Sequence, residues 1–350
     1  MKAGRKMALE KILFGTYTRG ASKGIYTANL NNITGQLQDA QLVAELGSPT
    51  YLHLSKAGYL YAINKKDADR GGVSVYDYRD GQKAVLIQEK LTEGRSPAYI
   101  SVDEDRQLLY VTNYHKGTIE SFAIKADGTI ELLDRFKSWG EGPRPEQDKA
   151  RLHFTNLTPD KRLVSVDLGA DKVYTLDISD EGIFSLVATY HAGTGFGPRH
   201  IRFSPDGQYA YLLGELSSLL SVLKYDEKTG SFTLIQTSST IPSNWNEHNG
   251  AGAIRLSADG RFVYTSNRGH NSIVVWQINQ TTGKVDPIQT ISTEGDFPRD
   301  FNLNANGEYL VAGNQNTDNI TVYRRDTTSG LLTLVQKDFV VPEAINVEFV

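Results

Sequence analysis

Short runs that alternate between apolar and polar residues recur along the chain, roughly 50 residues apart. They read VSVYDY at 73–78, IESFAI at 119–124, VYTLDI at 173–178, LSVLKY at 220–225, IVVWQI at 273–278 and ITVYRR at 320–325. Turn sequences such as DGT, DEG, KTG, TTG and TSG follow these runs. A period of two residues that ends in turn residues predicts β-strands, and no amphipathic helical pattern competes with it.

A longer unit surrounds each of these strands. It reads strand, Asp/Gly turn, strand, polar loop, strand, turn, and then a weaker, more exposed strand. Equivalent positions of the unit are Ser55, Asp103, Thr158, Ser204, Ser257 and Asn304, which are separated by 48, 55, 46, 53 and 47 residues. A four-stranded propeller blade takes roughly 40–50 residues, so this spacing predicts a ring of such blades.

The two ends of the chain carry incomplete units that complement each other. Residues 11–46 supply a second, third and fourth strand without a first, whereas VPEAINVEFV at 341–350 reads as a first strand alone. Joining them closes the ring and leaves no open sheet edge. We therefore predict an all-β, seven-bladed β-propeller of four-stranded blades, closed by the C-terminal strand. It would form one domain over residues 11–350, after an N-terminal extension at residues 1–10.

Composition narrows the range of partners. The net charge is −4 and no run of lysine and arginine forms a stripe, which argues against nucleic acid as a partner. The chain has no cysteine, which excludes disulfides and thiolate catalysis. No signal-peptide core or membrane-length apolar stretch occurs, so we expect no membrane partner and a cytoplasmic location. Without a His-Glu-x-x-His or an acidic calcium loop, we expect neither a metal nor a cofactor.

Two positions of the repeat are candidates for a functional site at one mouth of the propeller channel. The first, at the start of the inner strand, holds Thr50, Ala98, His153, Arg199, Gly252 and Arg299. The second, after the second strand, holds Tyr17, Lys65, Tyr114, Leu168, Glu215, Arg268 and Gln315. Repeat symmetry predicts that His153, Arg199, Arg268 and Glu215 converge in one pocket with Arg299 nearby. Because neighbouring strand side chains face opposite sides, His200 is predicted to point away from Arg199.

Several motifs at these positions resemble the seven-bladed lactonase family. They are GTYT at 15–18, GPRH at 197–200, ELSS at 215–218, SNRGHNSI at 266–273 and NQNTDNI at 314–320. The family includes 6-phosphogluconolactonases and a fungal carboxymuconate-lactonizing enzyme. By this resemblance, its histidine, two arginines and glutamate fall on His153, Arg199, Arg268 and Glu215. The chain departs from the family pattern at Arg151, where a first histidine is usual, and at Ala253, where a glutamate is frequent.

The candidate residues suit the hydrolysis of a lactone, which is a cyclic ester. Such a reaction needs an activated water, which Glu215 or His153 could supply, and Glu215 is preferred because it interrupts an apolar run. Arg199 and Arg268 are expected to hold a phosphate or the developing oxyanion. The expected substrate-binding residues are Arg299, Tyr17, Lys65, His200 and Gln315. No Gly-x-Ser-x-Gly elbow supports a serine nucleophile.

The resemblance and this chemistry together favour a hydrolase of a small anionic sugar δ-lactone. The expected substrate is 6-phospho-D-glucono-1,5-lactone, which is converted to 6-phosphogluconate in the pentose phosphate pathway. Two alternatives remain open at this point: a propeller that acts only as an interaction scaffold, and a muconate-type cycloisomerase. For single residues, Glu215 could form a structural salt bridge, and Arg299 could pair with Asp300.

Overall fold

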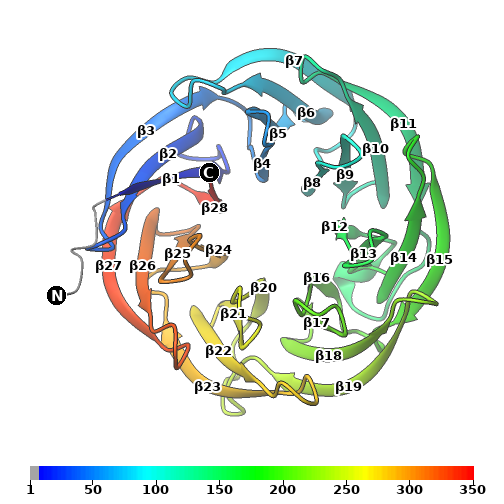
Figure 1. Cartoon of the computed structure of the whole chain (residues 1–350), viewed down its shortest axis with the longest axis vertical. Coiled ribbons are helices and arrows are strands. Elements are labelled where there is room, and N and C mark those ends of the chain that lie inside the picture. Colours follow the sequence, from blue (N-terminus) through cyan, green and yellow to red (C-terminus); the bar gives the residue numbers. More distant parts are fainter. Residues whose placement is uncertain (1–7) are drawn as a thin grey trace.

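Seven antiparallel sheets of four strands each surround a central channel in the computed structural model, which describes residues 8–350 (Figure 1). We number the sheets as blades 1 to 7 and name the strands of each from the channel outward. Blade 1 is β28 (Ala344–Phe349), β1 (Leu9–Thr16), β2 (Gly24–Asn31) and β3 (Leu37–Glu45); blade 2 is β4 (Leu52–Leu54), β5 (Tyr59–Lys65), β6 (Arg70–Asp77) and β7 (Val85–Glu93); blade 3 is β8 (Tyr99–Asp103), β9 (Leu108–Asn113), β10 (Thr118–Ile124) and β11 (Ile130–Lys137). Blade 4 is β12 (Leu152–Leu157), β13 (Leu163–Asp167), β14 (Lys172–Ile178) and β15 (Phe184–His191); blade 5 is β16 (Pro198–Phe203), β17 (Tyr209–Gly214), β18 (Leu219–Asp226) and β19 (Ser231–Ser239). Blade 6 is β20 (Gly250–Leu256), β21 (Phe262–Arg268), β22 (Ser272–Ile278) and β23 (Val285–Ser292); blade 7 is β24 (Pro298–Leu303), β25 (Tyr309–Asn314), β26 (Asn319–Arg325) and β27 (Leu332–Val340). A short 3₁₀ helix, η1 (Pro145–Gln147), lies in the connection between blades 3 and 4.

The two ends of the described chain meet in blade 1, which confirms the predicted closure of the ring. β28 forms the inner strand and pairs antiparallel with β1, with Phe14 opposite Val347. β1 begins at Leu9, two residues before the predicted start of the domain. Residues 1–7, most of the predicted N-terminal extension, lie outside the described residues.

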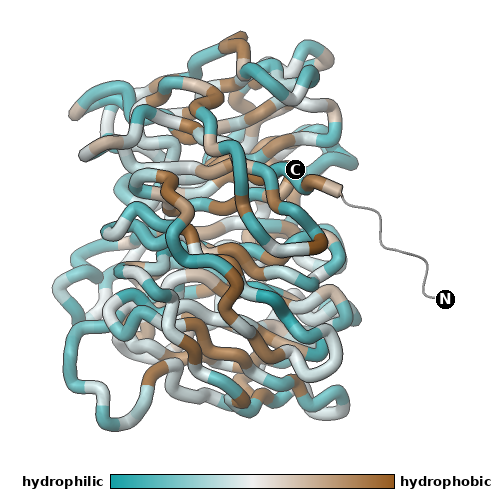
Figure 2. The backbone as a smooth tube through the Cα atoms, turned by 90° about the vertical axis from the view of Figure 1, so that its left-hand side faces the viewer, coloured by the Kyte–Doolittle hydropathy of each residue, from teal (hydrophilic) through white to brown (hydrophobic). Residues whose placement is uncertain are grey.

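The hydrophobic core consists of seven clusters of buried residues in the described chain, and each cluster joins neighbouring blades. Six join two blades, and the cluster between blades 4 and 5 also contains Tyr99 of blade 3. Phe14 and Val347 of blade 1, for example, pack with Tyr309 and Val311 of blade 7. Seen from the side, hydrophobic segments fill the middle of the disc, and its loops are mostly hydrophilic (Figure 2). Each blade is therefore stabilised mainly by its two neighbours, so the ring depends on closure.

The turn glycines of the repeat accept hydrogen bonds from the neighbouring blade. Tyr211 in blade 5 donates a hydrogen bond from its hydroxyl to the carbonyl of Gly283 in blade 6, at 3.1 Å. The same bond links Tyr61 to Gly128 and Tyr264 to Gly330. Gly283 has φ of 69°, and a Cβ there would collide with the ring of Tyr209.

Within residues 8–350, no helix is long and apolar enough to cross a membrane.

Candidate active site

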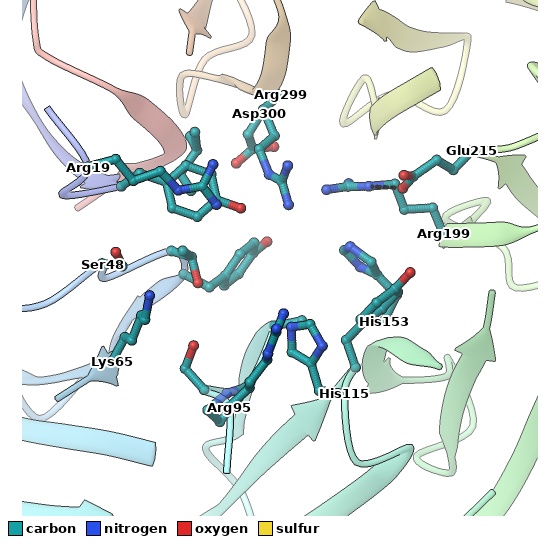
Figure 3. A pocket seen from close by; sticks show the side chains of 18 of the residues that line it. Arg19, Ser48, Lys65, Arg95, His115, His153, Arg199, Glu215, Arg299 and Asp300 are labelled. Atoms are coloured by element: carbon teal, nitrogen blue, oxygen red, sulfur yellow. Dashed lines mark ion pairs between the residues drawn. The ribbon is translucent and has the colours of Figure 1, made fainter. Parts of the chain in front are cut away.

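One mouth of the central channel opens into a cavity of about 570 Å³, a size that suits a small-molecule ligand (Figure 3). Nearly half of the residues that line it come from the two positions that the repeat singles out. Among the predicted positions, Thr50, Ala98, His153, Arg199 and Arg299 line it from the inner strands, and Tyr17, Lys65, Tyr114 and Glu215 line it from the ends of the second strands. The sequence thus located the mouth at which polar side chains gather.

β-Bulges turn three of these side chains toward the cavity. In β12, β16 and β24 the register with the neighbouring strand shifts by one residue, and the extra residue is His153, Arg199 and Arg299, respectively. A bulge breaks the strict alternation of side chains and re-aims the residue that it inserts. The prediction that His200 points away from Arg199 is therefore wrong. Both residues line the cavity, and Nη1 of Arg199 lies 3.1 Å from Nε2 of His200.

Glu215 links two buried arginines at the blade 5 side of the mouth. Its Oε2 lies 2.9 Å from Nε of Arg199, and its Oε1 lies 3.0 Å from Nη2 of Arg268 (the first pair is dashed in Figure 3). Arg199 also donates to the carbonyl of Gly252 at 2.7 Å, and Arg268 donates to the carbonyl of Ala251 at 2.9 Å. The structural salt bridge that was one alternative for Glu215 is therefore present, and it occupies both predicted anion-binding arginines.

The charges in this cluster shift one another's pKa. Burial alone would raise the pKa of Glu215, but Arg268 and Arg199 outweigh burial and lower it to about 2. Burial and the nearby charge of Arg268 lower the pKa of Arg199 to about 9. At neutral pH Glu215 is consequently a carboxylate and Arg199 a cation.

Two buried histidines lie beside this cluster. The rings of His153 and His200 meet edge to face, with centroids 5.3 Å apart. Burial and the charge of Arg199 lower the pKa of both far below the usual value, so both imidazoles are neutral at pH 7. Nδ1 of His153 has no hydrogen-bond partner in the described part of the chain. His153 lines the cavity as a neutral imidazole, and a neutral imidazole has one ring nitrogen that can accept a proton.

Arg299 and Tyr17 form a second group on the blade 7 and blade 1 side. The guanidinium of Arg299 lies 5.4 Å from the ring centre of Tyr17, and that of Arg19 lies 3.7 Å from it. Burial would raise the pKa of Tyr17, yet the surrounding arginines lower it overall. Asp300 does not pair with Arg299, because it binds Arg255 at 2.8 Å and Asn346 at 3.0 Å. The alternative of an Arg299–Asp300 ion pair is therefore wrong.

The remaining predicted residues lie outside the cavity wall. Arg268 contacts Glu215 without lining the cavity, and Gln315 donates instead to Asn316 at 3.1 Å. Arg151 pairs with Asp148, and its guanidinium lies 5.0 Å from the ring centre of Tyr114, a lining residue. Ala253 is fully buried in the core between blades 6 and 7.

Several polar residues that line the cavity were not predicted from the sequence. Among them are Arg19, Ser48, Arg95, Ser96 and His115. Arg95 lies three residues before Ala98, and His115 directly follows Tyr114. The repeat pattern points to one residue in each loop, so it does not reveal neighbours on the same loops. Within residues 8–350, no group of three or more metal-binding side chains occurs.

Comparison with known proteins defines the class of this propeller. The family model described as "Lactonase, 7-bladed beta-propeller" matches residues 11–349. The chain therefore belongs to the seven-bladed β-propeller lactonase family, as its motifs predicted.

Similar proteins extend over almost the whole chain. A 6-phosphogluconolactonase of Bacillus subtilis is 38% identical over 339 residues, covering 96% of this chain and 97% of that protein. A crystal structure of a protein from Lactobacillus plantarum is 50% identical, with a TM-score of 0.96 and coverage of 98% and 100%. The periplasmic gluconolactonase of Pseudomonas aeruginosa is 30% identical, with a TM-score of 0.91 and coverage of 98% and 99%.

Proposed function

We propose that this protein hydrolyses a sugar δ-lactone, and that its substrate is 6-phospho-D-glucono-1,5-lactone. One observation carries the proposal: neutral His153 shares a single cavity with Arg199 and Arg299. The name of the B. subtilis relative supports the phosphorylated substrate. On this proposal the protein acts in the cytoplasm, in the pentose phosphate pathway.

In the proposed reaction, His153 accepts a proton from a water molecule as that water attacks the lactone carbonyl carbon. The carbonyl oxygen takes up the electron pair and becomes an oxyanion. Arg299 stabilises this oxyanion, since no carboxylate in residues 8–350 pairs with its guanidinium. The intermediate then expels the ring oxygen, which takes the proton from His153 and becomes a hydroxyl group. The product carboxylic acid ionises in water.

Glu215 has a different role in this proposal from the one that its sequence context favoured. Arg199 and Arg268 engage both carboxylate oxygens of Glu215 and hold its pKa at about 2, whereas Nδ1 of His153 has no hydrogen-bond partner within residues 8–350. We assign Glu215 to positioning Arg199 and Arg268, and we assign the base to His153.

The direct test measures hydrolysis of 6-phosphogluconolactone and of unphosphorylated gluconolactone by purified protein. These lactones hydrolyse spontaneously, so the no-enzyme rate is subtracted at each pH. We expect hydrolysis well above that background, and faster with the phosphorylated lactone. Rates that equal the background for both lactones would contradict the proposal.

The pH dependence of kcat/KM tests the role of His153. The pKa of His153 is lowered well below 6.5, so its basic form is already complete at pH 7. We expect kcat/KM to be flat between pH 6.5 and 8 and to fall only under more acidic conditions, as His153 becomes protonated. His153→Gln should lower kcat by roughly 10²–10⁴-fold. If kcat/KM begins to fall between pH 7 and 6.5, or if His153→Gln keeps full activity, a group other than His153 is the base.

A further inference from the structure

The cations around the cavity fall into two groups that differ in their partners. Arg199 and Arg268 are held by Glu215. Four others line the cavity and form no ion pair within residues 8–350: Arg19, Lys65, Arg95 and Arg299. Arg19 and Arg299 both lie against the ring of Tyr17, whereas Lys65 and Arg95 make no cation–π contact in that part of the chain.

Lys65 and Arg95 lie across the mouth from Glu215. Lys65 ends β5 in blade 2, Arg95 lies between β7 of blade 2 and β8 of blade 3, and Glu215 follows β17 of blade 5. Figure 1 shows blades 2 and 5 on opposite sides of the ring, and Figure 3 shows Lys65 and Arg95 away from Glu215. The positive charges of Lys65 and Arg95 thus lie far from the carboxylate of Glu215.

The backbone at both cations is fixed by hydrogen bonds. The amide of Lys65 donates to the carbonyl of Gly47 at 2.7 Å, and a Cβ at Gly47 would collide with the Lys65 carbonyl. The side chain of Asn113 donates to the carbonyl of Arg95 at 3.0 Å. The side chains themselves remain exposed, so they can reach a ligand without breaking an existing ion pair.

Hydroxyl groups accompany the two cations on the same wall. Ser48 and Ser96 both line the cavity, next to Gly47 and Arg95 in the chain. Ser48 has φ of 43°, and its amide donates to the hydroxyl of Thr18 at 3.1 Å. Lysine, arginine and serine side chains are the usual donors to a phosphate group.

We propose that Lys65 and Arg95 form the subsite for the phosphate group of the substrate and set the preference for phosphorylated lactones. This inference rests on the proposed function. Glu215 already occupies Arg199 and Arg268, so the favourable place for a phosphate dianion is the wall where Lys65 and Arg95 lie without an ion pair in residues 8–350. Several bonds separate the phosphate from the lactone carbonyl, which leaves the carbonyl free to reach His153 and Arg299.

The test compares Lys65→Met, Arg95→Met and the double variant on the two lactones. Each single variant should lower kcat/KM for 6-phosphogluconolactone roughly 10–100-fold, the loss expected for one charge-assisted contact. The loss for unphosphorylated gluconolactone should be at least tenfold smaller. Lys65→Arg keeps the charge and should retain most of the preference. Added salt should raise KM for the phosphorylated lactone alone, because these cations are exposed.

Lys228→Met is the matched control, because Lys228 is exposed on the turn between β18 and β19 and the substitution changes the net charge equally. It should leave the rates for both lactones unchanged. Equal losses for both lactones in Lys65→Met and Arg95→Met, or no loss for either, would overturn the subsite.

Equilibrium binding separates this inference from the proposed function. Calorimetry would compare 6-phosphogluconate with gluconate as ligands of the wild-type protein and the double variant. We expect the wild type to bind 6-phosphogluconate more tightly and the double variant to lose that difference. If the wild type hydrolyses neither lactone, the proposed function fails, yet this binding pattern would still support the subsite. If the two proteins bind 6-phosphogluconate equally well, or neither binds it, the subsite is overturned.

Discussion

Removal of residues 344–350 should abolish the folded propeller. The deletion removes β28, so the inner edge of β1 loses its partner strand, and Ile12 and Phe14 lose Val347 from their core cluster. A free edge and an opened cluster between blades 1 and 7 together cost more than the roughly 5–15 kcal/mol that stabilises a typical protein. We expect aggregation or loss of the cooperative unfolding transition. Circular dichroism measured during heating would detect either change.

Two comparisons make this result specific to strand pairing. Val350→Ala alters an exposed residue just beyond β28 and should leave the melting temperature nearly unchanged. A synthetic peptide of residues 341–350, added to the truncated chain during refolding, should restore part of the transition by adding the missing strand. A truncated protein that melts at the wild-type temperature would contradict the role of β28 in closure.

Substitution of Glu215 by glutamine should damage both stability and activity. It leaves Arg199 and Arg268 buried without a carboxylate, and loss of one partner from a buried ion pair costs about 3 kcal/mol. Arg199 would then lose its orientation beside His200. His200 contacts the ring of His153, so this loss would also disturb the position of the base. We expect kcat/KM for lactone hydrolysis to fall on the order of 10²-fold, with a lower melting temperature.

The Glu215→Asp variant separates a positioning role for Glu215 from a merely structural one. It keeps a carboxylate beside Arg199 and Arg268 but shortens the side chain by one methylene group, so the ion pairs can form with altered geometry. If Glu215 positions Arg199, kcat should stay reduced in Glu215→Asp although the melting temperature recovers relative to Glu215→Gln. A kcat that recovers in step with the melting temperature would contradict the positioning role.

The fold could be predicted from the sequence because the patterns that indicate it are local and repeated. Alternating strands, turn glycines and blade-sized spacing predicted seven blades, and the half-units at 11–46 and 341–350 predicted the pairing of β28 with β1. Repeat position also located the mouth that holds His153, Arg199, Arg299 and Glu215.

The site was harder to predict because its geometry depends on irregular pairing. A bulge inserts one residue between two strands, and the alternation of a single strand does not reveal where its partner slips. The position of His200 was therefore predicted wrongly, since the register shifts at Arg199. The pairing of Arg199 and Arg268 with Glu215 likewise depends on contacts between blades 5 and 6, which no single motif specifies.

Blade 1 also imposes an order on biosynthesis. β1 leaves the ribosome early, but its inner partner β28 begins more than 300 residues later. At roughly 5–20 residues per second, the edge of β1 waits roughly 20–70 s for this strand. During that time, the β28 strand of another newly made chain can pair with this edge and produce strand-exchanged dimers. Slow translation and crowded polysomes should therefore increase the fraction of exchanged dimers in freshly made protein.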